Sequence, residues 1–300
     1  MRTVESSMEQ VTIRDSLKKQ QRQLAIRRFF SNKLMVIGSV IVLFLLLIVM
    51  IGPLLTPYDP YEMEVADRLQ GPSSQHLLGT DDFGRDLFTR IVYGAKVSMG
   101  IGFSVAMITS FMGMVIGLYA SYYRTLDNIL MRITDGLMAF PSILLAIALM
   151  AALGPKMGNV ILALSIVFTP YIARVVRSSA LVIKEETYIE AMRAQGASDT
   201  RIIWLHIAPN TLSPLVVQAT FIFADAIITE ASLSYLGAGV PSPNPSWGNI
   251  LYDGKLVIFN AWWMVVFSGL VIVASVLGLN LLGDGLRDFL DPKTNNNKNK

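Results

Sequence analysis

The sequence predicts an all-α integral membrane protein with six membrane-spanning helices. Hydrophobic residues make up 53% of the 300-residue chain and charged residues only 16%, whereas a soluble domain carries about 25% charged residues. Six apolar runs follow one another along the chain, most of them close to the roughly 20 residues that a spanning helix needs. Lys and Arg are unequally divided among the segments that join these runs. A water-soluble monomer of this composition could not cover its surface with polar groups.

The first span is expected at 34–55, because the run Leu34–Ile51 carries no charge and is long enough to cross the hydrocarbon core. A cleaved signal peptide is disfavoured, since 33 residues precede this run and no small-residue cleavage pattern follows it. The preceding segment 1–33 is basic, and beside a span its cations indicate topology determinants and phospholipid contacts rather than nucleic-acid binding. These cations are Lys18, Lys19, Arg22, Arg27, Arg28 and Lys33.

The segment 56–96 follows the first span and is expected to lie outside the cytoplasm. It ends in an amphipathic stretch, Arg85–Val97, whose apolar residues fall on one side of a helix. Such a helix is expected to rest on the membrane surface. Trp247, Trp262 and Trp263, near the outer ends of the last two spans, are typical of an aromatic belt.

A core of five further spans is expected over 97–283. The fourth run of the chain is short, but Val175 and Val176 extend it, while Arg174 and Arg177 could reach the interface by snorkelling. Pro141 and Pro170 could permit bends in two of the spans. Strands are disfavoured because runs of about 20 residues are far longer than a strand and no barrel-type alternation occurs. The five runs are Val97–Ala120, Ile133–Leu153, Asn159–Ala173, Leu212–Leu233 and Ala261–Leu282.

The distribution of basic residues predicts that both ends of the chain are cytoplasmic. With the N-terminus inside, the cytoplasmic segments hold 19 of the 25 Lys and Arg residues and the extracytoplasmic segments hold 6. This is the bias that the positive-inside rule describes. The tail 284–300 is therefore expected in the cytoplasm.

The cytoplasmic loop 177–210 is longer than a connection between two spans requires. Residues 184–195 favour a helix, and Gly196 suits the left-handed position that follows a helix end. Ser198 suits an N-cap for a second short helix through Trp204, with Asp199 in its first turn. Physical reasoning leaves two alternatives open: an amphipathic connector on the membrane surface, or a rigid hairpin that docks a soluble cytoplasmic partner.

The residues of this loop resemble a known signature. Glu190-Ala191-Met192-x-x-x-Gly196, followed by His206-Ile207-Ala208-Pro209, is similar to the EAA signature of permease subunits in bacterial ABC importers, and is closest to their peptide/nickel branch. Met192 and Ala208 depart from the usual residues, which leaves the packing at those positions open. Residues 78–98 and 230–248 resemble segments of the second permease of dipeptide and oligopeptide importers, so the resemblance covers about residues 34–290.

The resemblance implies a type I ABC importer permease fold in the bacterial plasma (inner) membrane. It implies that this subunit and a second permease subunit form a path for di- or oligopeptides, which an external binding protein delivers. Two ATPase subunits would hold the ATP and magnesium, in agreement with the absence of a G-x-x-x-x-G-K-[ST] motif here. No cofactor or catalytic residue is expected in this chain. The same machinery carrying nickel chelate or glutathione is the nearest alternative, and an intramembrane enzyme or a channel is more remote.

The resemblance also assigns residues to sites. It implies that the loop around Gly196 contacts an ATPase subunit and couples ATP binding to movement of the spans. The ATPase-coupling residues implied are Glu190, Ala191, Arg193, Gly196, Ala197, Ser198 and Asp199.

Two acidic residues, Asp225 and Glu230, fall within the fifth span. A charged side chain at the bilayer centre costs about 2.5–3.5 kcal/mol on insertion scales, so both are expected to face the helix bundle, the translocation path or the partner permease. For Asp225 the path and the partner permease are the two alternatives, and for Glu230 a structural role at the outer gate is favoured. At about 100° per residue the two lie about 140° apart, which argues against a paired-carboxylate site. No metal site is expected, since the chain has no cysteine and its two histidines, His76 and His206, are expected on opposite sides of the membrane.

Overall fold

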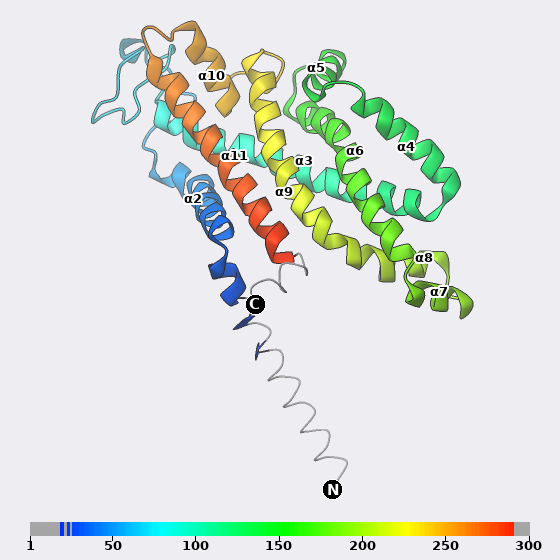
Figure 1. Ribbon diagram of the computed structural model, residues 1–300. Helices are drawn as coiled ribbons and strands as arrows, with labels where there is room; N and C mark the ends of the chain where they lie inside the picture. Colours follow the sequence, from blue (N-terminus) through cyan, green and yellow to red (C-terminus); the bar gives the residue numbers. More distant parts are fainter. Residues whose placement is uncertain (1–18, 21–22, 25, 291–300) are drawn as a thin grey trace.

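The computed structural model describes residues 19–20, 23–24 and 26–290, and α-helices dominate this part of the chain (Figure 1). Lys18, Arg22 and the end of the predicted tail, 291–300, lie outside the described residues. Five helices are long and apolar enough to cross a membrane, which confirms five of the predicted spans. They are α2 (Lys33–Leu55), α3 (Leu87–Tyr122), α6 (Met157–Lys184), α9 (Ala208–Tyr235) and α11 (Trp262–Leu290).

The third span differs from the prediction, because Ile133–Leu153 is not one continuous helix. The chain forms α4 (Arg124–Met138) and α5 (Ser142–Leu153), bent by 94° with respect to each other. Pro141 lies at the break, and a proline disfavours helical backbone in the residue before it. A helix of 12 residues is about 18 Å long, shorter than the hydrocarbon core of about 30 Å. The chain therefore has six spans only if α4 and α5 together are counted as the third one.

Helix α4 is tied to α6 by ion pairs. Asp127 accepts two hydrogen bonds from Arg177, at 2.5 Å from Nε and 2.7 Å from Nη2, and Asp135 pairs with Arg174. That both arginines reach the interface by snorkelling stays a prediction, and Arg174 keeps 47% side-chain exposure within its ion pair. Their acidic partners come from a different helix, and this long-range pairing is not visible in the sequence.

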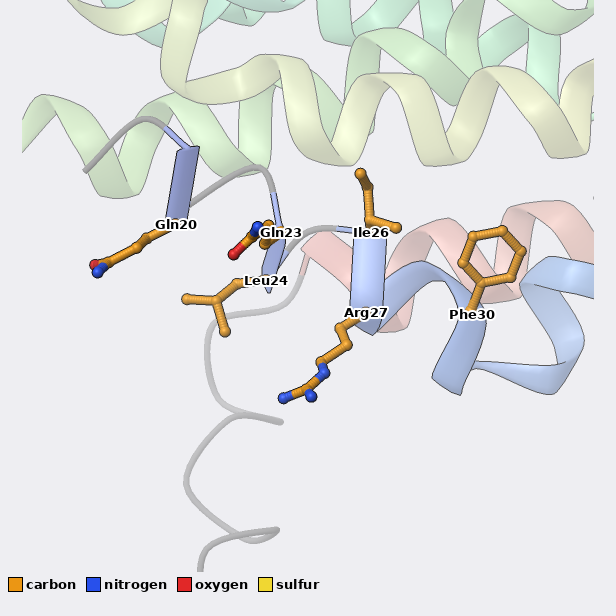
Figure 2. A pocket seen from close by; sticks show the side chains of 6 residues that line it. All are labelled: Gln20, Gln23, Leu24, Ile26, Arg27 and Phe30. Carbon is orange, nitrogen blue, oxygen red and sulfur yellow. The ribbon is translucent and has the colours of Figure 1, made fainter. Parts of the chain in front are cut away.

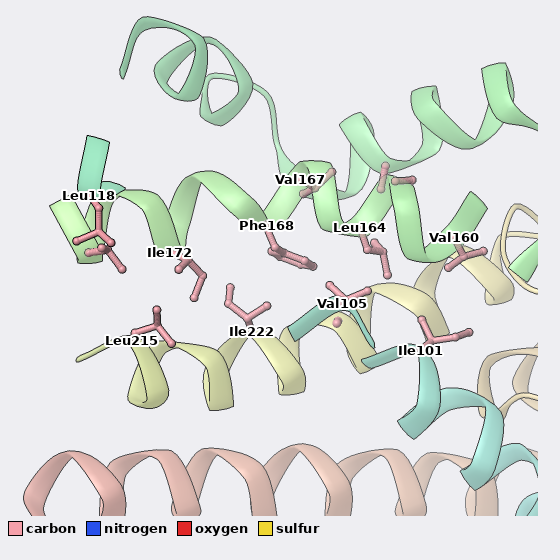
Figure 3. Packing of buried hydrophobic residues seen from close by; sticks show 14 of the residues in the cluster. Ile101, Val105, Leu118, Val160, Leu164, Val167, Phe168, Ile172, Leu215 and Ile222 are labelled. Atoms are coloured by element: carbon pink, nitrogen blue, oxygen red, sulfur yellow. The ribbon is translucent and has the colours of Figure 1, made fainter. Parts of the chain in front are cut away.

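The main core lies where α3 packs against α6 and α9 (Figure 3). Ile101 of α3, Leu164 of α6 and Ile222 of α9 are almost wholly buried there. A Cβ added at Gly113 of α3 would lie 2.5 Å from the Ile172 side chain. Glycine at this position therefore lets α3 and α6 approach closely, as small residues do between membrane helices.

The helices leave two distinct ends of the bundle. The start of α2, the end of α11 and the short helices α7 (Thr187–Ala194) and α8 (Asp199–Arg201) lie at one end, called the α7 end below (Figure 1). Helices α5 and α10 (Trp247–Leu256) lie at the opposite end, called the α10 end. The start of the first span and the end of the last span lie at the same end of the bundle, which agrees with an even number of membrane crossings. That this end faces the cytoplasm stays a prediction.

The predicted surface helix over Arg85–Val97 is wrong. Helix α3 starts at Leu87 and continues through these residues into the span, and Arg85 and Arg90 are only 2% exposed. Asp81 holds both of them, with its Oδ2 atom 2.6 Å from Arg85 Nε and 3.4 Å from Arg90 Nε. The helical pattern placed Arg85 and Arg90 on a solvent-exposed face, but both are buried in ion pairs with Asp81, and Arg85 also pairs with Asp253 of α10.

Two of the three tryptophans also differ from the predicted aromatic belt. Trp247 is fully buried and donates its indole N–H to Ile91 O at 3.1 Å, and Trp263 donates to Thr80 O at 3.1 Å. These two hydrogen bonds connect α10 to α3 and α11 to the loop before α3 at the α10 end. Trp262, 53% exposed, keeps the accessibility that a belt residue needs.

Candidate coupling hairpin and polar positions in the spans

The segment that the sequence assigned to coupling forms a tight helical turn at the α7 end. Gly196 follows the last residues of α7 with φ of +79°, in the left-handed region, as predicted. Its N–H donates to Arg193 O at 3.0 Å, and the Ala197 N–H donates to Met192 O at 3.0 Å. These two bonds form a Schellman motif, which satisfies carbonyls at the end of α7.

After this turn the chain runs into the fifth span without a break. Helix α8, the π-helical stretch η2 (Ile202–Ile207) and α9 follow one another directly. The predicted short helix through Trp204 is therefore the start of the helical column that continues as α9, and Pro209 lies inside this column, directly after the π-helical stretch. Ser198 occupies the N-cap position, but its side chain makes no capping hydrogen bond.

Asp199 instead connects the hairpin to the end of α3. Its carboxylate accepts hydrogen bonds from the hydroxyls of Tyr122, at 2.6 Å, and Tyr123, at 3.1 Å. The Arg193 guanidinium lies 5.1 Å from the centre of the Tyr122 ring. The two tyrosines were not singled out from the sequence, because 76 and 77 positions separate them from Asp199.

The base of the hairpin is attached to the rest of the chain, whereas its tip is exposed. Ile189 is fully buried within the main core, and the Lys184 ammonium donates to Ser121 O at 3.1 Å and to Tyr122 O at 3.3 Å. Ala197 is half-buried. The other predicted coupling residues are exposed: Glu190, Ala191, Arg193, Gly196, Ser198 and Asp199. The arrangement is a rigid projection with small and charged side chains available to another protein.

Glu230 lies in the interior of the folded subunit, away from its surface. It is fully buried, and its carboxylate accepts hydrogen bonds from Ser98 at 2.9 Å and Ser234 at 2.8 Å. The same hydroxyls accept bonds from the N–H groups of Trp247, at 3.2 Å, and Val240, at 3.1 Å. Glu230 therefore holds both sides of the loop between α9 and α10. The two serines were not singled out from the sequence, and Trp247 was predicted there only as a residue of the aromatic belt.

Asp225 has the opposite environment. It is exposed, whereas Ala224 and Ala226 beside it are fully buried, so it lies on the outward face of α9. The structure thus separates it from Glu230, in agreement with the predicted angular difference between the two acids.

A second polar cluster at the α10 end contains a titratable carboxyl. Asp253 of α10 lies 3.4 Å from Arg85, and partial burial, together with the negative charge of Asp82, raises the pKa of Asp253 to about 6. A folded chain with this pKa binds a proton that the unfolded chain releases near pH 4, so ionisation of Asp253 destabilises the fold as the pH rises from about 4 through 6.

Asp253→Asn is expected to remove this pH dependence. The unfolding midpoint of the wild type should fall relative to that of Asp253→Asn as the pH rises from about 4 to 6, and the difference between the two should then stay constant. Thermal unfolding of the detergent-purified chain at several pH values measures it. A difference that stays constant over this range would contradict the raised pKa.

One surface hollow lies beside the start of α2 (Figure 2). It has a volume of about 710 Å³ and is lined by exposed side chains of a single short stretch. Leu24, Ile26 and Phe30 are each about half exposed or more, and Arg27 lies among them. Exposed apolar and cationic side chains next to a span are typical of a segment at the membrane surface. The hollow includes none of the predicted site residues.

No cluster of three or more His, Asp or Glu residues suited to a metal ion occurs in the described part of the chain. His76 is 3.0 Å from Asp86 and 3.7 Å from Asp67. Asp86 also accepts the Thr89 N–H at 2.8 Å, which caps the start of α3. The histidine is thereby accounted for by structural contacts.

Comparison with known proteins places this geometry in context. Residues 109–296 match the family described as binding-protein-dependent transport system inner membrane component. Residues 20–72 match the N-terminal TM domain of oligopeptide transport permease C.

Curated relatives match nearly the whole chain. A dipeptide transport system permease protein of Alkalihalophilus pseudofirmus is 47% identical over 90% of this chain and 89% of its own length. A glutathione transport system permease protein of Pectobacterium atrosepticum is 44% identical over 89% of each chain. A solved chain of the MetNI methionine ABC transporter, in an inward-facing conformation, is 22% identical with a TM-score of 0.56, and the match covers 67% of this chain and 97% of that one. The last likeness shows the fold.

Proposed function

The chain belongs to the family of binding-protein-dependent transport system inner membrane components, and we propose that it forms a peptide path with a second permease subunit. Family membership makes it a multi-pass inner membrane permease subunit of an ABC importer and a non-catalytic component. The cargo in this proposal is a di- or oligopeptide delivered by an external binding protein. The observation that carries it is the 47% identity, over nine tenths of the chain, to a permease named for dipeptides.

In this proposal the hairpin around Gly196 docks into one of two ATPase subunits, which bind the ATP and magnesium. The exposed residues Glu190, Arg193 and Asp199 form the contact, while buried Ile189 anchors it. Because α8, η2 and α9 are one uninterrupted column, a displacement of the hairpin moves the fifth span directly. The hydrogen bonds of Asp199 carry the same displacement to α3. A π-helical stretch at this junction supports a functional role, since such stretches are frequent at functional sites.

Glu230 and Asp225 have different proposed roles. Glu230 is a positioning residue that keeps the loop between α9 and α10 in place, because its two serine partners also hold that loop. Asp225 faces either the translocation path or the partner permease, since its exposed carboxylate must avoid lipid.

Glutathione is the second candidate cargo, supported by the 44% identity to a glutathione permease. The relative named for dipeptides is the more similar of the two, so the peptide proposal takes precedence.

Isolation of the native complex, followed by uptake in proteoliposomes, tests the proposed function. We expect a second permease and ATPase subunits to co-purify with this chain. We also expect uptake of a labelled dipeptide that requires both ATP and the binding protein, with glutathione taken up more slowly. Purification without any ATPase subunit, or uptake that persists without ATP, would refute the proposal.

A further inference from the structure

The Asp225 carboxylate has no hydrogen bond or ion pair with any residue that the structure describes. Its backbone carbonyl accepts a bond from Thr229 at 2.7 Å, but the side chain contributes to no such contact. It lies within a spanning helix, away from both helix ends, where a lipid-facing acid costs about 2.5–3.5 kcal/mol. The position therefore requires water or a cationic group next to it.

A groove begins one helical turn from Asp225. Residues three and four positions apart lie on the same face of a helix, which places Ile228 and Thr229 beside Asp225. Both line a groove of about 780 Å³, within the usual range for small-molecule sites. Side chains of α5, α9, α10 and α11 complete its wall: Ser142, Ile143, Ser232, Tyr235, Leu251 and Ile272 are among them.

The chemistry of this groove favours a cation. Thr229 and Ser232 each donate their hydroxyl hydrogen to a carbonyl of their own helix, at 2.7 and 2.8 Å. Their remaining lone pairs are therefore acceptors. No Lys or Arg lines the groove. Of the two acids in α9, Glu230 is buried and hydrogen-bonded to Ser98 and Ser234, so the exposed carboxylate of Asp225 is the charge of this helix that a ligand in the groove can approach. Apolar side chains occupy the rest of the wall, so the groove suits a ligand with a cationic end and an uncharged remainder.

We propose that Asp225 is a selectivity residue, which binds the ammonium group of the cargo one helical turn from the groove residues Ile228 and Thr229. This inference rests on the proposed function for the identity of the cargo. A peptide with a free amino terminus supplies the positively charged N–H donors that a carboxylate accepts strongly. Its side chains would lie against Ile228, Tyr235 and Ile272. The competing occupant of the same face is the partner permease.

Charge-selective labelling of the assembled complex tests the site without depending on the cargo. This chain contains no cysteine, so Thr229→Cys gives it a single thiol, one helical turn from Asp225, whose labelling is read on this subunit after separation of the complex. We expect the cationic-to-anionic ratio of methanethiosulfonate reaction rates at this thiol to be at least tenfold larger than the ratio of the same reagents with a small free thiol. Adding Asp225→Asn should reduce that ratio to about the ratio of the free reagents with a small thiol. Val40→Cys, on the exposed face of α2, is the control and should react with neither reagent.

Uptake links the site to transport. Asp225→Asn is expected to lower the uptake of a labelled dipeptide with a free amino group at least tenfold, and Asp225→Glu, which keeps the charge, should restore most of it. Val216→Asn adds an amide at another exposed position of α9 and should transport at the wild-type rate.

Three results would overturn the inference. A rate ratio at Thr229→Cys that is no larger than the ratio of the free reagents with a small thiol excludes an effect of the Asp225 carboxylate on the groove. If the thiol reacts with neither reagent but can be cross-linked to the partner permease, this face of α9 is assigned to the contact with that subunit. Wild-type peptide uptake by Asp225→Asn excludes the selectivity role while leaving the proposed function intact. If the wild-type complex takes up no dipeptide, the proposed function fails, and the labelling ratio still decides whether Asp225 faces a cation-selective groove.

Discussion

Gly196→Pro is expected to abolish the stimulation of ATP hydrolysis by the loaded binding protein. Gly196 has a φ of +79°, whereas the proline ring restricts φ to about −65°. Proline also lacks the N–H that Gly196 donates to Arg193 O at 3.0 Å. The turn between α7 and α8 cannot close with this residue, so the exposed tip loses the shape that the proposed docking needs. Stimulated ATPase activity of the reconstituted complex should fall at least tenfold.

Matched variants separate backbone strain from other effects. Nothing lies within 4 Å of a Cβ placed at Gly196, so Gly196→Ala adds only the cost of a left-handed non-glycine residue, about 1–2 kcal/mol, and should reduce stimulation partially. Gly158 in α6 also has open space but no positive φ, and Gly158→Ala should behave as wild type. Glu190→Lys reverses a charge on the tip and is expected to uncouple transport without unfolding the spans. Unchanged stimulation in Gly196→Pro would refute the coupling role.

Arg85→Met is expected to cause the largest loss of stability. Arg85 and Asp81 are 2% and 1% exposed, with 2.6 Å between Nε and Oδ2. Removal of one partner from a buried ion pair typically costs about 3–5 kcal/mol, because the remaining charge stays buried without compensation. Arg90, 3.4 Å from Asp81, compensates only in part. The free energy of unfolding of the detergent-purified chain measures the loss.

An exposed pair of the same chemistry provides the control. The side chains of Arg174 and Asp135 are 47% and 61% exposed, and such pairs contribute about 0–1 kcal/mol. Arg174→Met should therefore cost far less than Arg85→Met. Adding Asp81→Asn to Arg85→Met should recover part of the stability, since it removes the uncompensated carboxylate. Equal losses for the two arginine variants would show that burial does not determine the strength of the Arg85 pair.

Membrane spans were predictable because the bilayer imposes a local rule. A helix that crosses about 30 Å of hydrocarbon needs about 20 apolar residues in succession, and this is visible in any window of sequence. Five spans were found in the structure as continuous helices on that basis. The position of Gly196 was predictable for a similar reason, since a left-handed residue after a helix end is a local requirement of the backbone.

The errors share a different cause. Helical periodicity assigned Arg85 and Arg90 to a wet surface, because a pattern along one helix does not reveal that Asp81 lies beside both of them. The ion pair between Arg177 and Asp127 was missed in the same way, since Asp127 is 50 positions away. Charged residues are expected at water unless they are paired, and their partners are known only once the helices are packed.

Sequence alone therefore determined the class of protein, its order of spans and the glycine turn of the hairpin, because these follow from local composition and backbone geometry. Tertiary structure decided that Glu230 is buried against Ser98 and Ser234, while Asp225 faces outward beside an open groove. Both are acids of one span, and nothing within the span distinguishes a satisfied carboxylate from an unpaired one. That difference depends on the hydroxyl of Ser98 in α3, which donates to Glu230, and on the N–H groups of Val240 and Trp247, which hold Ser234 and Ser98 in place. Only the packed chain brings these groups to Glu230, and it brings no such group to Asp225 among the described residues.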